Sequence, residues 1–288
     1  MNSRETLRHR NVGSGGELRE PLLRQDSDAD ELDHGHEIEP GHCSPLGPLK
    51  KCAEFLIHLA RTLGLLRHPA VVQHELVLSE IQRDRLEALW AGVAVMYDGQ
   101  DARHAAALRR LWELALPGRT LPESMVTPEW KDMGWQGTNP ATDFRSAGLI
   151  SLQHLLYLGE RHPRTFQRLL NKEEGTRSEW EYPFAVGGVN ISFMLTEMLQ
   201  LRKQPEVPQR APFRGFAKLL AVDDCALEEL FVATFELLDY HWLDQRASYM
   251  EFPHVMSATK KAVEEALSSQ RFECTGELVA HIRSQCHR

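Results

Sequence analysis

The sequence has few of the features that mark secreted, membrane-spanning or nucleic-acid-binding proteins. Its five cysteines are scattered without a CxxC pair, so neither a disulfide framework nor a structural zinc site is expected. No apolar run reaches the roughly 18 residues that span a bilayer. The formal net charge of −8 argues against a nucleic-acid partner, which would require clusters of basic residues. These absences predict a cytoplasmic protein without a transmembrane segment, whose membrane contacts are peripheral or made through a partner.

Residues 1–47 carry much of the acidity. They hold ten Asp and Glu residues against five Arg and are poor in aromatic residues. Such a composition buries too little apolar surface to offset the entropy lost on ordering, so a disordered acidic arm is predicted. His34, His36, His42 and Cys43 lie close together there. We interpret them as solvated side chains of the arm, and no metal site is predicted.

From residue 48 onward, apolar residues recur with helical spacing. The segments with this pattern are 55–63, 78–90, 102–116, 164–171, 191–201, 227–242 and 253–268. Few segments alternate with period two over the length of a strand. The sequence therefore predicts an all-α fold, an irregular bundle of about eight or nine helices. One globular domain is expected over 48–270, followed by a C-terminal tail over 271–288.

Local signals refine this picture. Thr127 followed by Pro128 predicts the start of a short helix, because threonine is a good N-cap and proline suits the first helical position. Residues 172–188 are expected to form a loop, and the prolines at 205, 208 and 212 a linker. Asp223 or Asp224 is expected to cap the helix that follows. Gly187-Gly188 could cradle an anion, but no GxxxxGK[ST] motif is present, so the chain is not expected to bind GTP itself.

The stretch from Trp130 to Leu158, WKDMGWQGTNPATDFRSAGLISLQHLLYL, is the most distinctive part of the chain. Its large apolar side chains are expected to hold a polar loop on the core. Its glycines are expected to allow positive φ or close backbone approach, and its proline to stiffen the loop. These structural residues are Trp130, Gly134, Trp135, Gly137, Pro140 and Phe144. Thr142 or Asp143 is placed to cap the apolar helix that follows.

Arg145 is predicted to lie in the opening turn of that helix. A cation there faces the positive end of the helix dipole, at a cost of roughly 0.3 to 1 kcal/mol, so helix propensity does not explain it. Two roles remain open. Arg145 could reach outward to a partner's phosphate. Alternatively it could end the stripe formed by Leu149, Leu152 and Leu156 and be buried against a carboxylate, as a structural ion pair.

The pattern of the loop resembles the signature of the ELMO-domain family (engulfment and cell motility domain). It consists of a tryptophan, Gly134, an aromatic residue, Gln136-Gly137, Pro140 and Asp143-Phe144-Arg145 before an apolar helix. Segments 182–195, 235–242 and 247–252 also resemble that family, so the likeness covers about 90–268. The chain departs from the usual pattern at Trp135, Asn139 and Ser146. The last of these could alter how closely a partner approaches.

The resemblance implies the architecture of a short, stand-alone member and a GTPase-activating protein for Arf or Arf-like small GTPases. In that role Arg145 would be the catalytic arginine, supplied in trans, and Gln136, Asn139 and Asp143 would contact the partner. The chain would need no cofactor of its own, because GTP and Mg²⁺ would be bound by the GTPase. The alternative that the resemblance leaves open is a non-catalytic binding module or scaffold for small-GTPase regulators of the Rac exchange-factor type.

Overall fold

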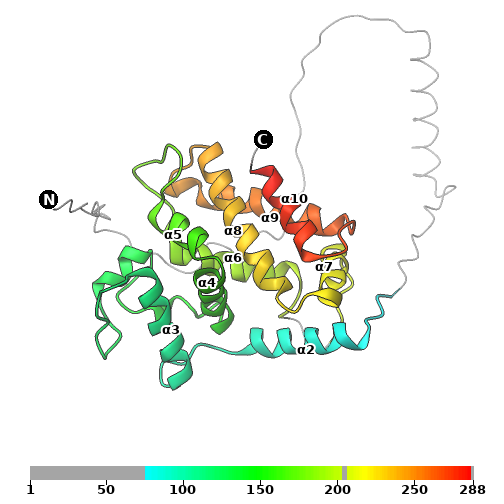
Figure 1. Ribbon diagram of the computed structural model, residues 1–288, viewed down its shortest axis with the longest axis horizontal. Helices are drawn as coiled ribbons and strands as arrows, with labels where there is room; N and C mark the ends of the chain where they lie inside the picture. The colour runs from blue at the N-terminus through cyan, green and yellow to red at the C-terminus, as the bar shows by residue number, and fades with distance from the viewer. Residues whose placement is uncertain (1–74, 203–205, 287–288) are drawn as a thin grey trace, which may run out of the picture. The chain divides into compact units, whose positions relative to one another are not determined.

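The computed structural model describes residues 75–202 and 206–286, and every regular element in these ranges is helical. The all-α prediction is therefore confirmed for this part of the chain (Figure 1). The predicted acidic arm and the predicted helix at 55–63 lie outside the described residues. The α-helices are α2 (Glu80–Ala94), α3 (Ala102–Ala115), α4 (Leu149–Arg161), α5 (Pro163–Asn171), α6 (Phe184–Met198), α7 (Ala211–Val222), α8 (Ala226–Asp244), α9 (Phe252–Ser268) and α10 (Thr275–Gln285). Three 3₁₀ helices are η1 (Pro128–Met133), η2 (Pro140–Thr142) and η3 (Tyr249–Glu251).

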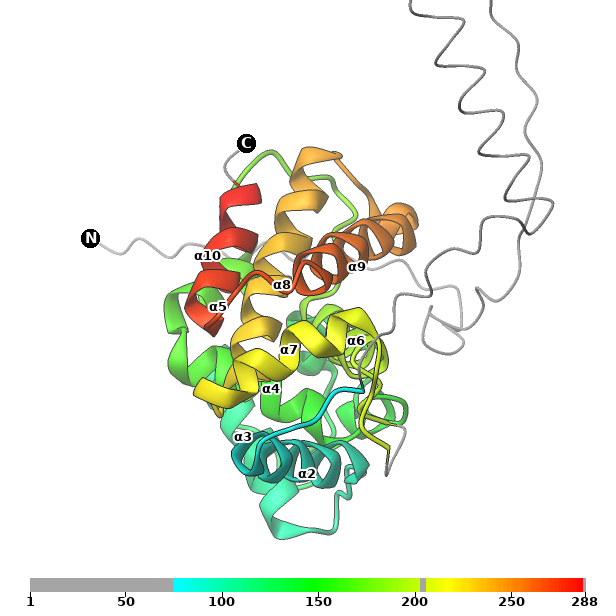
Figure 2. The same ribbon diagram turned by 90° about the vertical axis from the view of Figure 1, so that its right-hand side faces the viewer.

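Helix α8 is the centre of the core. It packs against α4, α6, α7, α9 and α10, and Figure 2 shows it between α10 and α9. The predicted apolar stripe of α8 is present, but burial extends well beyond one face, to Val232, Ala233 and Leu237 among others. A helix that is apolar nearly all round is stable only when neighbours surround it. The core is therefore organised around α8, whereas α2 packs on α4 and α7, and α3 packs on α4.

Two segments that the sequence predicted as irregular are helical. The linker expected at the prolines 205, 208 and 212 overlaps α7, which begins at Ala211 and includes Pro212. Pro212 occupies the first turn of that helix, where its missing N–H removes no helical hydrogen bond. Residues 275–285, expected as tail, form α10. Leu278 and Ile282 of α10 are fully buried, and the helix packs against α8 and α9.

Helix α6 begins earlier than predicted, at Phe184, so Gly187 and Gly188 lie inside it rather than in a loop. Their proposed role as an anion cradle is wrong. The amide of Gly187 donates to Pro183 O at 2.8 Å, and a Cβ at Gly188 would meet the side chain of Leu155 at 2.6 Å. Gly188 lets α4 and α6 approach closely, and Gly187 faces the rings of Tyr182 and Phe235.

Within the described residues, no helix is long and apolar enough to cross a membrane.

Thr127 caps η1 through its side chain, with Pro128 at the first helical position, as predicted. The α8 cap differs. Cys225 is the N-cap residue, and the Asp223 carboxylate accepts a hydrogen bond from the Cys225 amide at 2.9 Å.

Candidate functional site

The long connection from α3 to α4 carries the distinctive loop, and a row of aromatic rings holds it to the core. The ring of Trp112 on α3 meets that of Trp130 at 4.7 Å between centroids. Trp130 meets Trp135 at 6.3 Å, and Trp135 meets Phe144 at 5.2 Å. Trp130, Trp135 and Phe144 are at most 3% exposed, and edge-to-face pairs of this kind add to the burial energy of each ring. The loop is thus held by side chains from both of its ends.

Gly134 presses the loop against the start of α6. Its φ of +83° is left-handed, and a Cβ there would lie 2.5 Å from the backbone nitrogen of Phe184. The Gly134 carbonyl accepts from the amide of Val186 at 3.3 Å. Only glycine combines this conformation with this approach. Gly137, in contrast, has no positive φ, and a Cβ there would lie 3.9 Å from its nearest neighbour, the backbone nitrogen of Asn139.

Arg145 does not belong to α4. The helix starts at Leu149 with Gly148 as N-cap, so Arg145 lies in the preceding turn, and the predictions of a first-turn cation and of a cap by Thr142 or Asp143 are wrong. The helix-dipole cost therefore does not apply to it. Gly148, with φ of +78°, redirects the chain between the turn and the helix.

Three contacts hold the turn at 143–148. The amide of Gly148 donates to Phe144 O at 2.8 Å, and the amide of Leu149 donates to Val95 O at 2.9 Å. A guanidinium nitrogen of Arg202 donates to Ala147 O at 3.0 Å. The first bond closes the turn itself, and the other two come from Val95 and Arg202, so the backbone that carries Arg145 is also fixed from two other parts of the chain.

The side chain of Arg145 is exposed, between buried Phe144 and the partly buried Ser146. Among the described residues, no hydrogen bond or ion pair joins it to another group. The stripe at Leu149 and Leu152 is buried as predicted, but Arg145 is not part of it. A buried ion pair for Arg145 is therefore absent from the described part of the chain.

The polar neighbours of Arg145 differ in what they do. Asp143 Oδ2 accepts a hydrogen bond from the Gln136 amide at 3.1 Å, which ties the two ends of the loop together. Burial raises the pKa of Asp143, and the Gln136 amide, the Thr142 hydroxyl and the charge of Arg145 oppose that rise. Asn139 Oδ1 accepts from the Ala141 amide at 3.1 Å and so caps η2. The side chains of Gln136 and Asn139 are exposed, and Pro140 is buried.

Arg202 is the contributor that sequence reasoning missed. It follows the predicted helical segment 191–201 and lies four residues beyond the end of α6. Its guanidinium also donates to Thr196 Oγ1 at 3.0 Å and lies 4.9 Å from the Phe193 ring centroid. Burial lowers the pKa of Arg202, and Glu197 opposes this. No local pattern points to a contact with Ala147, 55 residues away.

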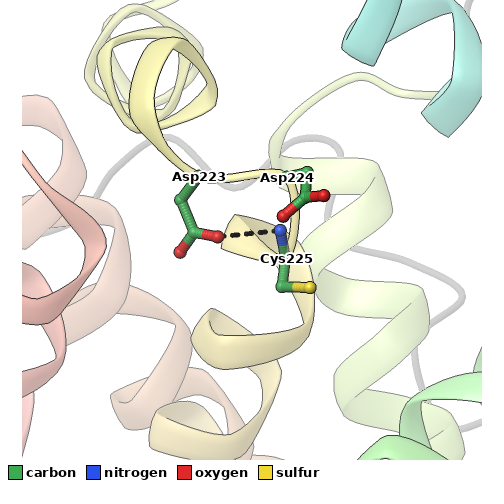
Figure 3. Close-up of side chains that lie close together, drawn as sticks. All are labelled: Asp223, Asp224 and Cys225. Atoms are coloured by element: carbon green, nitrogen blue, oxygen red, sulfur yellow. Dashed lines mark hydrogen bonds between the residues drawn. The ribbon is translucent and has the colours of Figure 1, made fainter.

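One group of metal-ligating side chains occurs in the described part of the chain, at the start of α8 (Figure 3). The ligand atoms of Asp223, Asp224 and Cys225 lie within 4.8 Å of one another. Asp223 already accepts a hydrogen bond from the Cys225 amide. Burial and the nearby carboxylates raise the pKa of the Cys225 thiol, whereas a metal ligand must be the thiolate. The arrangement is explained as a local turn before α8.

Comparison with known proteins connects this loop to a family. The family model described as "ELMO/CED-12 family" matches residues 88–256, which include the whole loop. ELMO domain-containing protein A of Dictyostelium discoideum is 32% identical over 205 residues, covering 66% of this chain and 21% of that protein. ELMO domain-containing protein 1 of Mus musculus is 35% identical over 118 residues, 36% of each chain.

Engulfment and cell motility protein 2 of Homo sapiens is 28% identical over 151 residues, covering 51% of this chain and 20% of that protein. The chain spans about a fifth to a third of the length of the first curated relatives that it matches. The likeness therefore concerns the helical domain and not the whole of those proteins. Because the family model covers more than half of the sequence, including the aromatic-anchored loop with Arg145, the chain belongs to the ELMO/CED-12 family.

Proposed function

We propose that this chain is a GTPase-activating protein for Arf or Arf-like small GTPases, with Arg145 as the arginine supplied in trans. The observation that carries the proposal is the state of Arg145. Its side chain is exposed and has no hydrogen-bond or ion-pair partner in the described residues, while the turn beneath it is held by Val95, Arg202 and the buried Phe144. A rigid base with an available guanidinium is what insertion into a partner requires.

The chemistry suits an arginine. During GTP hydrolysis negative charge is spread over the transferring phosphoryl group, and an arginine that reaches it from a second protein accelerates the reaction about 10³ to 10⁵-fold. The guanidinium is planar and always charged, and it can donate two parallel hydrogen bonds to phosphate oxygens. GTP, Mg²⁺ and the attacking water would all be held by the GTPase. This chain would contribute Arg145, with Gln136, Asn139 and Asp143 beside it.

Single-turnover hydrolysis tests the proposal directly. Purified Arf and Arf-like GTPases, loaded with GTP, would be mixed with the full chain, with Arg145→Lys, and with Arg271→Lys as a control. Arg271 is an exposed arginine between α9 and α10. We expect the full chain and the control to accelerate hydrolysis by at least one GTPase, and Arg145→Lys to lose most of that acceleration.

Thermal melts must accompany the assay. Because Arg145 is exposed, Arg145→Lys should change the free energy of unfolding by no more than about 0.5 kcal/mol. If the variant loses activity but melts at the same temperature as the parent, the loss is due to the missing guanidinium and not to unfolding. The proposal fails if no Arf-class GTPase responds to the full chain, or if Arg145→Lys is as active as the parent.

The second candidate is a non-catalytic binding module for small-GTPase regulators of the Rac exchange-factor type. The similarity to engulfment and cell motility protein 2 favours it. This function would show as binding to a GTPase or an exchange factor without faster hydrolysis and without dependence on Arg145. In either case the chain would act in the cytoplasm and reach membranes peripherally, through its partner.

A further inference from the structure

The connection between α2 and α3 lies directly beside the Arg145 turn. Val95 O accepts from the Leu149 amide at 2.9 Å, just after the turn. The ring of Tyr97 meets that of Phe144 at 4.8 Å, just before Arg145. Residue 96 therefore lies between two residues, 95 and 97, whose partners, Leu149 and Phe144, lie on either side of residue 145.

Met96 points away from the core at this position. The backbone is extended at Val95, with φ of −76° and ψ of 119°, and side chains alternate between faces along an extended segment. Since the Tyr97 ring packs inward on Phe144, the side chain of Met96 is directed outward. Met96 is 54% exposed and Val95 is 39% exposed. Two exposed apolar side chains thus lie on the segment that contacts the residues before and after the Arg145 turn.

We propose that Val95 and Met96 form an apolar contact surface for the same GTP-bound small GTPase that receives Arg145. This inference rests on the proposed function. An arginine that reaches a bound phosphate must come within about 3 Å of its oxygens, so the partner has to cover the surface around the base of Arg145. Residues 95 and 96 are part of that surface. Methionine is enriched in protein interfaces and adapts its shape to the facing surface.

The charge around this surface favours a protein occupant over a lipid bilayer. The next residues along the connection include Asp98, which is exposed, and Asp101, which is partly exposed. The charge of Arg145 also acts on Asp143. Anionic membranes attract clusters of basic residues, whereas residues 95–101 include two carboxylates and no basic residue.

The test separates docking from chemistry. The full chain, Met96→Asp, Arg145→Lys and Met250→Asp would be titrated against the GTP-loaded GTPase that responds to the full chain. Met250 is the matched control, because it is 81% exposed on η3, which packs against α9. We expect Met96→Asp to raise the half-saturating concentration at least tenfold with little change in the saturated rate. Arg145→Lys should instead lower the saturated rate, and Met250→Asp should behave like the parent.

A second arm measures binding alone, with each Arf-class GTPase held by a non-hydrolysable GTP analogue. If the parent accelerates hydrolysis and Met96→Asp has unchanged half-saturation, the contact surface is wrong and the proposed function stands. If the parent binds a GTPase without accelerating it and Met96→Asp abolishes binding, the surface stands and the proposed function fails. If the parent neither binds nor accelerates any of them, both fail. Melting temperatures equal to the parent's exclude misfolding of the variants.

Discussion

Arg177 donates two hydrogen bonds to the carboxylate of Asp239, at 3.0 Å to Oδ1 and 2.8 Å to Oδ2. The two side chains are 6% and 2% exposed. The hydroxyl of Tyr182 donates to the same Oδ1 at 2.7 Å. This ion pair joins the loop between α5 and α6 to the central helix α8, so a segment with little apolar surface is fixed to the core by a buried charge.

Asp239→Asn should destabilise the fold by about 3 to 5 kcal/mol, because it removes the buried carboxylate that accepts from both terminal nitrogens of Arg177 and leaves Glu181 as the remaining ion-pair partner of that guanidinium. Urea denaturation of the purified chain measures this. Glu113→Gln is the control, since Glu113 pairs with Arg110 on the surface of α3 with both side chains at least half exposed. That substitution should cost less than about 1 kcal/mol. Equal losses for the two variants would contradict the buried role of Asp239.

Arg202→Met should loosen the turn that carries Arg145. Methionine fills similar space but cannot donate to Ala147 O or Thr196 Oγ1, and each buried acceptor left without a partner costs about 1 to 3 kcal/mol. Hydrogen–deuterium exchange at the amides of residues 148 and 149 should become faster in this variant. In Arg271→Met, which alters an arginine between α9 and α10, exchange at these two amides should stay at the parent's rate. Unchanged exchange rates at these two amides in Arg202→Met would show that the turn is stable without the hydrogen bonds of Arg202.

Gly134→Ala should be far more harmful than Gly137→Ala, although both glycines belong to the same motif. At Gly134 the new Cβ would meet the Phe184 backbone at 2.5 Å in a left-handed conformation, which together should cost about 2 to 4 kcal/mol. At Gly137 the Cβ would have room, and the change should stay within about 1 kcal/mol. Chemical denaturation of the two variants decides this. A large loss of stability in Gly137→Ala would mean that residue 137 is glycine for its backbone conformation and not for lack of space.

The helices that the sequence predicts well are those with one apolar face and clear ends. Helix α3 matches its predicted range within a residue, because Asp101 caps its start and Pro117-Gly118 follow its end. Helices α6, α7 and α10 were misjudged for different reasons. Two glycines lie inside α6, Pro212 lies in the first turn of α7, and α10 is held by burial against α8 and α9. Gly187 and Gly188 signalled a loop in the sequence, but Gly187 faces Tyr182 and Phe235, and Gly188 allows the close approach of Leu155 on α4.

In the candidate site, too, some features could be predicted from the sequence and others could not. The aromatic residues and Gly134 could be identified from the motif, because their types alone indicate anchoring and a tight turn. The position of Arg145 outside α4 could not, since Gly148 ends the turn through its backbone angles and through the contact with Val95. Arg202 and Met96 approach the turn only after the chain has folded, and no spacing in the sequence connects them to residue 145.

His154 should make the fold sensitive to acid. It is fully buried on α4, its ring stacks on Phe231 at 4.9 Å, and its Nδ1 lies 2.9 Å from Ser192 Oγ. The Ser192 hydroxyl donates to Gly188 O at 3.0 Å, so the imidazole is the donor to Ser192. Burial lowers the pKa of His154 to about 3, from an ordinary value of 6.5.

A group whose pKa is lower in the folded state binds its proton mainly after unfolding, so its contribution to stability is complete above pH 6.5 and is lost as the pH falls toward 3. In that window one such group lowers the free energy of unfolding by up to about 1.4 kcal/mol per pH unit. Urea denaturation at a series of pH values should show a smaller acid slope for His154→Leu than for the parent. His254→Leu, at an exposed histidine on α9, should retain the parent's slope. Parallel slopes for all three proteins would mean that His154 takes up its proton without opening the core.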